Sequence, residues 1–143
     1  MEVRDITKLS GLGLQTISPE CSVHEVVKRL VEHNIGALPV CDDGGALVGI
    51  ITERDVLKLS AGDKVETALA KPVSEVMTRD LVIGVRDDTI EYVMQVMTEH
   101  RIRHLPIVEG EELVGIISIG DVVKAELEES STEIRYLRDY VAQ

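Results

Sequence analysis

The sequence contains two copies of one segment, and this repeat constrains the fold more than any other feature. Residues 23–41 align with residues 90–108 at an offset of 67, and residues 47–58 align with residues 113–124 at an offset of 66. Six of the 19 positions in the first stretch and eight of the 12 in the second are identical. One such unit cannot bury its own apolar face, so we expect the two copies to pack on each other about a pseudo-twofold axis. A ligand bound between them would have two related sites.

Length and charge restrict the class of protein. With 143 residues the chain is about the size of one compact domain, so the copies should be halves of a single domain. The formal net charge of -11 argues against partners such as nucleic acid or an anionic membrane, because either would require a basic face. The net charge does not exclude small anionic ligands, which could bind where basic side chains lie close together.

The sequence also predicts a cytoplasmic protein. No apolar run approaches the roughly 20 residues that cross a bilayer, and the N-terminal residues MEVRD lack the basic start and apolar core of a secretory signal. Cys21 and Cys41 lie at non-equivalent places in the repeat, without CxxC spacing. We therefore expect two reduced, partly buried thiols.

Each copy begins with an amphipathic helix. In the first copy Ser22 and Glu25 have the spacing of a capping box, and the apolar stripe that follows predicts a helix over about residues 23–33. In the second copy Thr89 precedes an equivalent stripe that runs through Met97.

A hairpin follows the helix. The apolar runs 38–41 and 47–51, separated by an acidic and glycine-rich turn, predict two strands. Pro39 has no amide donor, so its strand should be an edge or very short. In the second copy the turn 109–112 is one residue shorter.

A second helix ends each copy. Residues 52–55 open a helix that reaches about Leu59, and residues 118–121 open the last helix of the chain. Ser130 and Glu133 form a further capping box, which predicts a new helix with an apolar stripe. That stripe either packs on its own domain or forms a subunit interface.

Similar segments also precede the two copies. Residues 3–7 and 73–78 occupy the same relative place, and each leads to a predicted short strand, at 15–18 and 81–85. Residues 60–72 connect the copies.

The order of these motifs resembles a CBS domain, named for cystathionine β-synthase. The shared pattern is Ile-x-x-Leu-Pro, an acidic turn with glycine, and Leu-Val-Gly-Ile-Ile-Thr/Ser-x-x-Asp, and two copies resemble a CBS pair, or Bateman module. The resemblance implies an α/β (α+β) fold of two β-α-β-β-α repeats packed sheet to sheet and dimerised as a disc. Within one module over 1–143, the parts would be repeat 1 (3–60), a connector (61–72), repeat 2 (73–129) and a C-terminal helix (130–143).

The resemblance also implies a stand-alone regulatory module that binds AMP, ADP, ATP or S-adenosylmethionine in clefts between the repeats and signals to an unidentified partner protein. The residues allow this chemistry, because Asp55 and Asp121 lie one turn inside helices that Thr52 and Ser118 open. Such a carboxylate accepts both vicinal hydroxyls of a ribose, and the Ser or Thr hydroxyl and the free amides of a helix start bind phosphate oxygen. The same pattern also fits an ordinary helix cap, and the two roles are compatible.

Two clefts follow from the resemblance, each lined from both repeats. The first would contain Asp121, Ser118 and Ile116, with Ser18, Val23 and Leu47 around the adenine. The second would contain Asp55, Thr52 and Ile50, facing Val85, Ile90 and Leu113.

The copies differ most in charge. Before Leu-Pro the second copy has Arg101, Ile102, Arg103 and His104, where the first has Asn34, Ile35, Gly36 and Ala37. A phosphate in an acidic protein needs nearby cations, so we expect the Asp121 cleft, with Arg103 and His104, to bind the phosphorylated ligand better. The alternative is that Arg54, inside the first Thr-x-x-Asp, and Lys58 or Lys124 supply cations that compensate.

Other site classes receive less support from the sequence. It has no Ser-His-Asp set, paired catalytic carboxylates or glycine-rich phosphate loop, so we expect no catalytic residue, no cofactor and no enzymatic activity. We expect no metal site either, since no second His or Cys lies at ligand spacing from His33 or His100. The alternatives are a dimerisation or scaffold domain without ligand, an S-adenosylmethionine sensor, and a divalent-metal sensor that uses the acidic turns.

Overall fold

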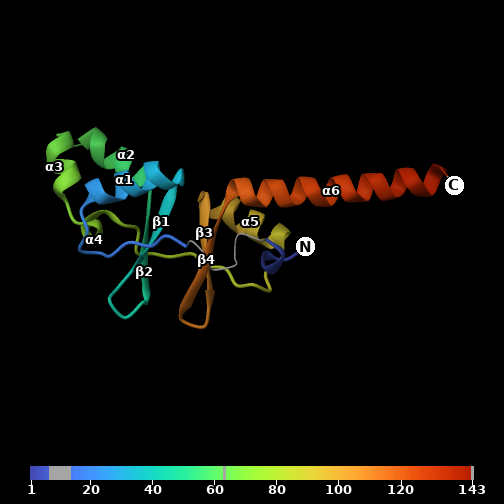
Figure 1. Cartoon of the computed structure of the whole chain (residues 1–143), viewed down its shortest axis with the longest axis horizontal. Helices are drawn as coiled ribbons and strands as arrows, with labels where there is room; N and C mark the ends of the chain where they lie inside the picture. Colours follow the sequence, from blue (N-terminus) through green and yellow to red (C-terminus); the bar gives the residue numbers. More distant parts are fainter. Residues whose placement is uncertain (7–13, 63, 143) are drawn as a thin grey trace. The chain divides into compact units, whose positions relative to one another are not determined.

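The computed structural model describes residues 1–6, 14–62 and 64–142, and these form two compact units (Figure 1). The described residues of unit 1 are 1–6, 83–109 and 114–142, and those of unit 2 are 14–62, 64–82 and 110–113. Each two-stranded sheet is accompanied by helices, so the fold is α+β, as expected. Three predicted parts fall partly outside the described residues, namely repeat 1 at residues 7–13, the connector at Asp63 and the C-terminal helix at Gln143.

The units do not coincide with the sequence repeats. The N-terminal residues 1–6 belong to the unit of the second repeat, and residues 73–82 belong to the unit of the first. In unit 2 the amide of Val73 donates to the carbonyl of Cys21 at 2.8 Å, and the amide of Ser74 donates to the carbonyl of Pro19 at 3.0 Å. Each segment that precedes one repeat in the sequence therefore packs with the elements of the other repeat.

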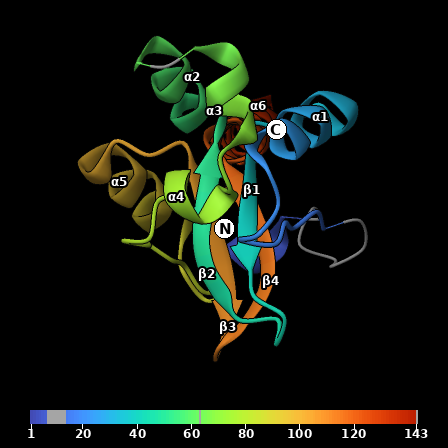
Figure 2. The same cartoon turned by 90° about the vertical axis from the view of Figure 1, so that its left-hand side faces the viewer.

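Unit 2 contains the helix, hairpin and helix of the first repeat, followed by two short helices. Its elements are α1 (Val23–His33), β1 (Ala37–Cys41), β2 (Leu47–Thr52), α2 (Glu53–Gly62), α3 (Val65–Ala70) and α4 (Val73–Val76). The strands are antiparallel, with Pro39 opposite Ile50 and a register shift between Val40 and Cys41. Figure 2 shows β1 and β2 side by side. The predicted bounds of the first helix are confirmed.

The cap of α1 forms only half of the predicted capping box. The Ser22 hydroxyl accepts from the amide of Glu25 at 3.3 Å. The Glu25 carboxylate accepts instead from Arg29 Nε, also at 3.3 Å. Arg29 lies one turn further along α1, where a charge-assisted bond to Glu25 competes with the reciprocal cap.

The core of unit 2 is entirely aliphatic, because the chain has no Phe or Trp. Its buried members are Ile17, Val26, Leu30, Leu38, Val40, Ile51, Val73 and Met77. At Gly49 of β2 a Cβ atom would lie 2.6 Å from Met77 Sδ and 3.0 Å from the carbonyl oxygen of Thr78. The glycine therefore allows residues 77–78 to approach the strand.

Unit 1 repeats the plan with a much longer last helix. Its elements are the 3-10 helix Val3–Asp5, α5 (Ile90–His100), β3 (His104–Glu109), β4 (Glu112–Ser118) and α6 (Ile119–Ala142). Residues 112 and 113 of β4 group with unit 2. The α5 cap matches the prediction, since the Thr89 hydroxyl accepts from the amide of Tyr92 at 3.1 Å.

The strands predicted at 15–18 and 81–85 are reduced to single parallel bridges. Ile17 donates to the carbonyl of Pro39 and accepts from the amide of Cys41, both at 3.0 Å. Extension of this ladder would need an N–H from Pro39 on one side and from Pro19 on the other, and neither residue has one. Gly84 makes the same two bonds to residues 106 and 108, both at 2.9 Å, and Pro106 blocks the equivalent extension.

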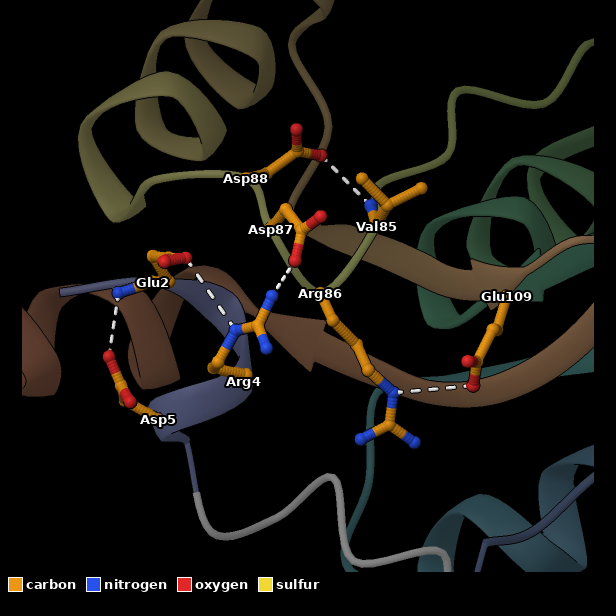
Figure 3. Close-up of polar contacts among 8 residues, drawn as sticks. All are labelled: Glu2, Arg4, Asp5, Val85, Arg86, Asp87, Asp88 and Glu109. Carbon is orange, nitrogen blue, oxygen red and sulfur yellow. Dashed lines mark hydrogen bonds and ion pairs between the residues drawn. The ribbon is translucent and has the colours of Figure 1, made fainter.

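The N-terminal segment is held in unit 1 by backbone bonds and by an ion pair between Arg4 and Asp87, which Figure 3 shows. Val3, which is fully buried, donates its amide to the carbonyl of Asp88 at 2.9 Å. Arg4 pairs with Glu2 and Asp87, and Arg86 Nε lies 3.7 Å from a Glu109 carboxylate oxygen. The segment thus supplies both a core side chain and surface ion pairs.

The prediction that a new helix begins at Ser130 is wrong, because α6 continues without a break from Ile119 to Ala142. Serine and threonine are tolerated inside a helix when the hydroxyl bonds to the carbonyl one turn earlier. The Thr132 hydroxyl does this, donating to the carbonyl of Glu128 at 2.9 Å. The 24 residues of α6 are long enough to cross a membrane but too polar, and no helix in the described residues is both long and apolar enough to do so.

Candidate functional site

The start of α2 in unit 2 is a reciprocal cap between Thr52 and Asp55. The Thr52 hydroxyl accepts from the amide of Asp55 at 3.2 Å, and the Asp55 carboxylate accepts from the amide of Thr52 at 3.0 Å. Both residues are half-buried. The cap explains why a hydroxyl residue and an acid are needed three positions apart.

The start of α6 in unit 1 has the same geometry. The Ser118 hydroxyl accepts from the amide of Asp121 at 3.2 Å, and Asp121 Oδ2 accepts from the amide of Ser118 at 2.8 Å. Both residues are again half-buried. The structure therefore brings together the Ser/Thr and Asp predicted for each site, with the aspartate carboxylate folded back on the N-terminus of its helix.

The first amide of each helix is also occupied. Ile119 donates to the carbonyl of Arg103 at 2.8 Å, and Glu53 donates to the carbonyl of Gly36 at 2.9 Å. Two of the first three amides of each helix thus have protein partners, so the prediction that these amides are free to bind phosphate is wrong for residues 119 and 121, and for their equivalents 53 and 55. The hydroxyl and nearby cations are candidate phosphate-binding groups that do not depend on these amides.

The same bonds bring the backbone of Arg103 to the start of α6 and the backbone of Gly36 to the start of α2. Arg103 is exposed, and its backbone is bonded to the first residue of α6, whereas Gly36 holds the equivalent place at α2. His104 is half-buried at the beginning of β3. Arg101 is also exposed, and it ends α5 in the left-handed conformation with φ 55°. The sequence predicts these cations but not the bond between Ile119 and Arg103. That bond joins two backbone atoms, so it does not depend on which side chains are present.

The predicted apolar contacts differ in their exposure. Val23 and Ile90, the first residues of α1 and α5, are fully buried, so their side chains offer no surface to a base in this structure. Ser18, Leu47, Leu113 and Ile116 are half-buried, and Val85 is 42% exposed. Ile50 is 8% exposed. The grouping of residues from both repeats around one adenine stays a prediction.

The backbone groups of two predicted cleft residues, Ile50 and Val85, are bonded within the protein. Ile50 donates to the carbonyl of Thr78 at 3.0 Å and accepts from the amide of Thr78 at 2.8 Å. The amide of Val85 donates to Asp88 Oδ2 at 2.8 Å. Sequence reasoning missed both partners, since each lies in a loop without a recognisable motif.

The hollow that lies along α6 does not involve the predicted ligand contacts. An open hollow of about 710 Å³ lies along α6, lined by Gly120, Val123, Lys124, Leu127, Glu128, Ser131 and Thr132. None of these is among the residues predicted to touch a ligand. Within residues 1–6, 14–62 and 64–142, no group of three or more His, Cys, Asp or Glu side chains is arranged to hold a metal ion.

Comparison with characterised sequences identifies relatives of similar organisation. The chain is 39% identical over 118 residues to the CBS domain-containing protein YhcV of Bacillus subtilis, covering 81% of each. It is 37% identical over 124 residues to the mitochondrial CBS domain-containing protein CBSX3 of Arabidopsis thaliana, of which it spans 60%.

Solved structures agree with these relatives. A CBS-domain-containing protein from Agrobacterium tumefaciens has a TM-score of 0.82 at 41% identity, over 87% of this chain and 92% of that one. The CBS domain pair of protein MJ0100, solved with 5′-methylthioadenosine and S-adenosyl-L-methionine, has a TM-score of 0.76 at 31% identity. CBSX2, solved with AMP, has a TM-score of 0.77 at 28% identity. Each of these two matches covers 90% of this chain and 98% of the other.

The family model of the CBS domain matches this sequence twice, over residues 3–62 and 73–128. The two matched stretches together cover most of the 143 residues and contain both capped helix starts. The chain therefore belongs to the CBS domain family and carries two CBS domains in tandem.

Proposed function

We propose that this chain is a regulatory module that senses an adenosine nucleotide, and that the start of α6 is its main contact with the ribose and phosphate. The observation that carries the proposal is the reciprocal cap of Ser118 and Asp121, with Arg103 bonded to the same turn. The cap uses Asp121 Oδ2. A carboxylate has two oxygens and about four lone-pair sites, so capping is compatible with accepting the two hydroxyls of a ribose.

The cation at this turn favours a phosphorylated ligand. A guanidinium pairs with phosphate through two parallel hydrogen bonds, and Arg103 is exposed at the α6 start. The equivalent place at α2 is Gly36, which supplies no charge. We therefore assign the higher nucleotide affinity to the Asp121 site and a lower one to the Asp55 site.

The two ligand-bound relatives support an adenosine ligand in general. AMP, 5′-methylthioadenosine and S-adenosylmethionine share the adenosine group, and each carries a ribose with vicinal hydroxyls. S-Adenosylmethionine is the second candidate, favoured by the MJ0100 complex. It has no phosphate, and it carries a positive sulfonium and an ammonium beside its single carboxylate, so a cation at Arg103 favours AMP over it.

Sensing requires that the ligand prefer one conformation of the module. A ligand shifts a conformational equilibrium only by the difference between its affinities for the two states. We propose that the state favoured by nucleotide presents a different surface to a partner protein, and that the module itself performs no catalysis.

Thermal unfolding with and without ligand tests the proposal. AMP at about 100 times its dissociation constant should raise the free energy of unfolding by about 2.7 kcal/mol. A scaffold without ligand would show the same melting temperature with AMP, ATP, adenosine and S-adenosylmethionine, and this result would refute the sensing role.

A matched pair of variants tests the assigned phosphate contact. Arg103→Ala should weaken AMP binding about tenfold, because it removes a charge-assisted contact, and should leave adenosine binding unchanged. Arg135→Ala, which removes an exposed arginine far along α6, is the control. If Arg103→Ala leaves the affinity for AMP unaltered, the assigned phosphate contact is wrong.

A further inference from the structure

The first turns of α6 have one buried and one exposed apolar face. Val122 and Ala125 are 0% and 5% exposed, on the side of α6 that packs within unit 1. Val123 and Leu127 face away and are 44% and 63% exposed. The helix therefore carries apolar surface that unit 1 does not use.

The exposed residues continue as a regular seam to the end of the helix. The seam positions are Val123, Leu127, Ser130, Ile134, Leu137 and Val141, separated alternately by four and three residues. Ile134, Leu137 and Val141 are 52%, 53% and 81% exposed. Alternate spacing of four and three is the heptad pattern of a coiled coil, with Leu127, Ile134 and Val141 at one core position and Val123, Ser130 and Leu137 at the other.

Beyond the ion pair between the N-terminal amine of Met1 and Glu129, the last turns of α6 are exposed in a single chain. Residues 127–141 are all exposed, and Figure 1 shows this part of α6 continuing past α5 and the rest of unit 1. Helices of this length are marginal in water without a packed face. A partner along the seam would provide that face.

The charged residues beside the seam favour a second copy of this chain as the partner, with the two helices parallel. In a parallel pair of identical helices, Glu133 of one copy lies beside Arg138 of the other, and the symmetry makes this contact twice. In an antiparallel pair with full overlap, Glu133 would face Glu133, and Lys124 would face Arg138. Like charges at these places oppose the antiparallel arrangement.

We propose that two copies of this chain associate through the seam of α6 as a parallel two-stranded coiled coil. Leu127, Ile134, Leu137 and Val141 pack in the interface, and the Glu133–Arg138 pairs set the direction. The inference concerns assembly only and does not depend on the nucleotide site.

Charge reversal in the full-length protein tests the direction. Glu133→Arg alone and Arg138→Glu alone should each raise the dissociation constant of the dimer about tenfold, measured by sedimentation equilibrium, because each change creates two repulsive contacts. The double reversal should restore the constant to within about twofold of the parent. An antiparallel pair would keep like charges at position 133 after Glu133→Arg and would show no rescue.

Disulfide cross-linking tests the interface itself. In a Cys21→Ser, Cys41→Ser background, Ile134→Cys should form a disulfide between copies, because parallel core positions face their own equivalents. Arg135→Cys points away from the seam and should stay reduced under the same oxidant.

Three results would overturn the proposal. They are equal cross-linking by Ile134→Cys and Arg135→Cys, single reversals that leave the dissociation constant unchanged, and a parent chain that stays monomeric at all concentrations. The last result would assign the seam to another protein.

Discussion

At the scale of single residues, Asp121 and Asp55 have identical structural roles but different surroundings. Each carboxylate caps its own helix through the amide three residues earlier. The first amide of α6 bonds to the backbone of Arg103, whereas the first amide of α2 bonds to that of Gly36. Structural role therefore does not distinguish the two aspartates, and a functional difference between them must come from the neighbouring charge.

Substitution of each aspartate by asparagine isolates this difference. Asparagine keeps an oxygen that can accept the capping bond but loses the charge and one acceptor. Asp121→Asn should weaken AMP binding more than Asp55→Asn, measured by titration calorimetry, with unfolding free energies of the two variants alike. Equal losses of affinity would remove the assigned asymmetry.

Gly49 tests a different residue-scale claim, about packing. The Cβ of an alanine would lie 2.6 Å from Met77 Sδ, which can move, and 3.0 Å from the backbone oxygen of Thr78, which moves less easily. Gly49→Ala should therefore lower the free energy of unfolding by about 1–3 kcal/mol in denaturant titrations. Gly62→Ala is the control, because a Cβ there would meet nothing within 4 Å. Equal stability of the two variants would contradict the described packing.

At the scale of elements, the repeat and its apolar periods predict most of the fold. The first helix runs from Val23 to His33, as its stripe and cap indicate, and both hairpins are present. The predicted strand at 15–18 is a single bridge, because its length depends on prolines in partner segments. The continuity of α6 through Ser130 also escaped prediction, since a capping signature does not show whether the preceding helix has ended.

The candidate site was likewise predictable in part. Thr52, Asp55, Ser118 and Asp121 follow from sequence spacing, and their mutual bonds are confirmed. The partners that occupy the first amides and the backbone of Ile50 come from distant loops. Such contacts depend on tertiary packing, so spacing along the chain contains no signal for them.

Removal of the end of α6 tests whether the element has two separable parts. The proposed ligand contacts lie in its first turn, and residues 130–141 are exposed. A chain that ends after Glu129 should keep its affinity for AMP within about twofold, because no capping bond is removed, and should lose self-association through the seam. A large loss of AMP affinity, measured by calorimetry, would show that the tail contributes to the site.

At the scale of the whole molecule, the described units exchange the segments that precede the repeats. Val3 is fully buried in the unit of the second repeat, and Val73 is fully buried in the unit of the first. The matched family boundaries at residues 3–62 and 73–128 therefore describe repeats of sequence, and each folded unit takes residues from both.

This exchange predicts that the second repeat does not fold alone. A fragment of residues 73–143 lacks Val3 and the bonds of the N-terminal segment to residues 86 and 88. It should show no cooperative thermal transition by circular dichroism, because part of its core is missing. Addition of residues 1–6 through a short linker should restore a transition, and a fragment that melts cooperatively without them would contradict the interleaved arrangement.

The central claim is that the carboxylate at the start of α6 binds the ribose of an adenosine nucleotide, and a crystal structure of the full chain with AMP tests it most directly. The account predicts ribose hydroxyl oxygens at about 2.5–3.0 Å from the Asp121 carboxylate. An AMP-soaked crystal with no nucleotide at this helix start, and with Asp121 still bonded to the Ser118 amide, would contradict it.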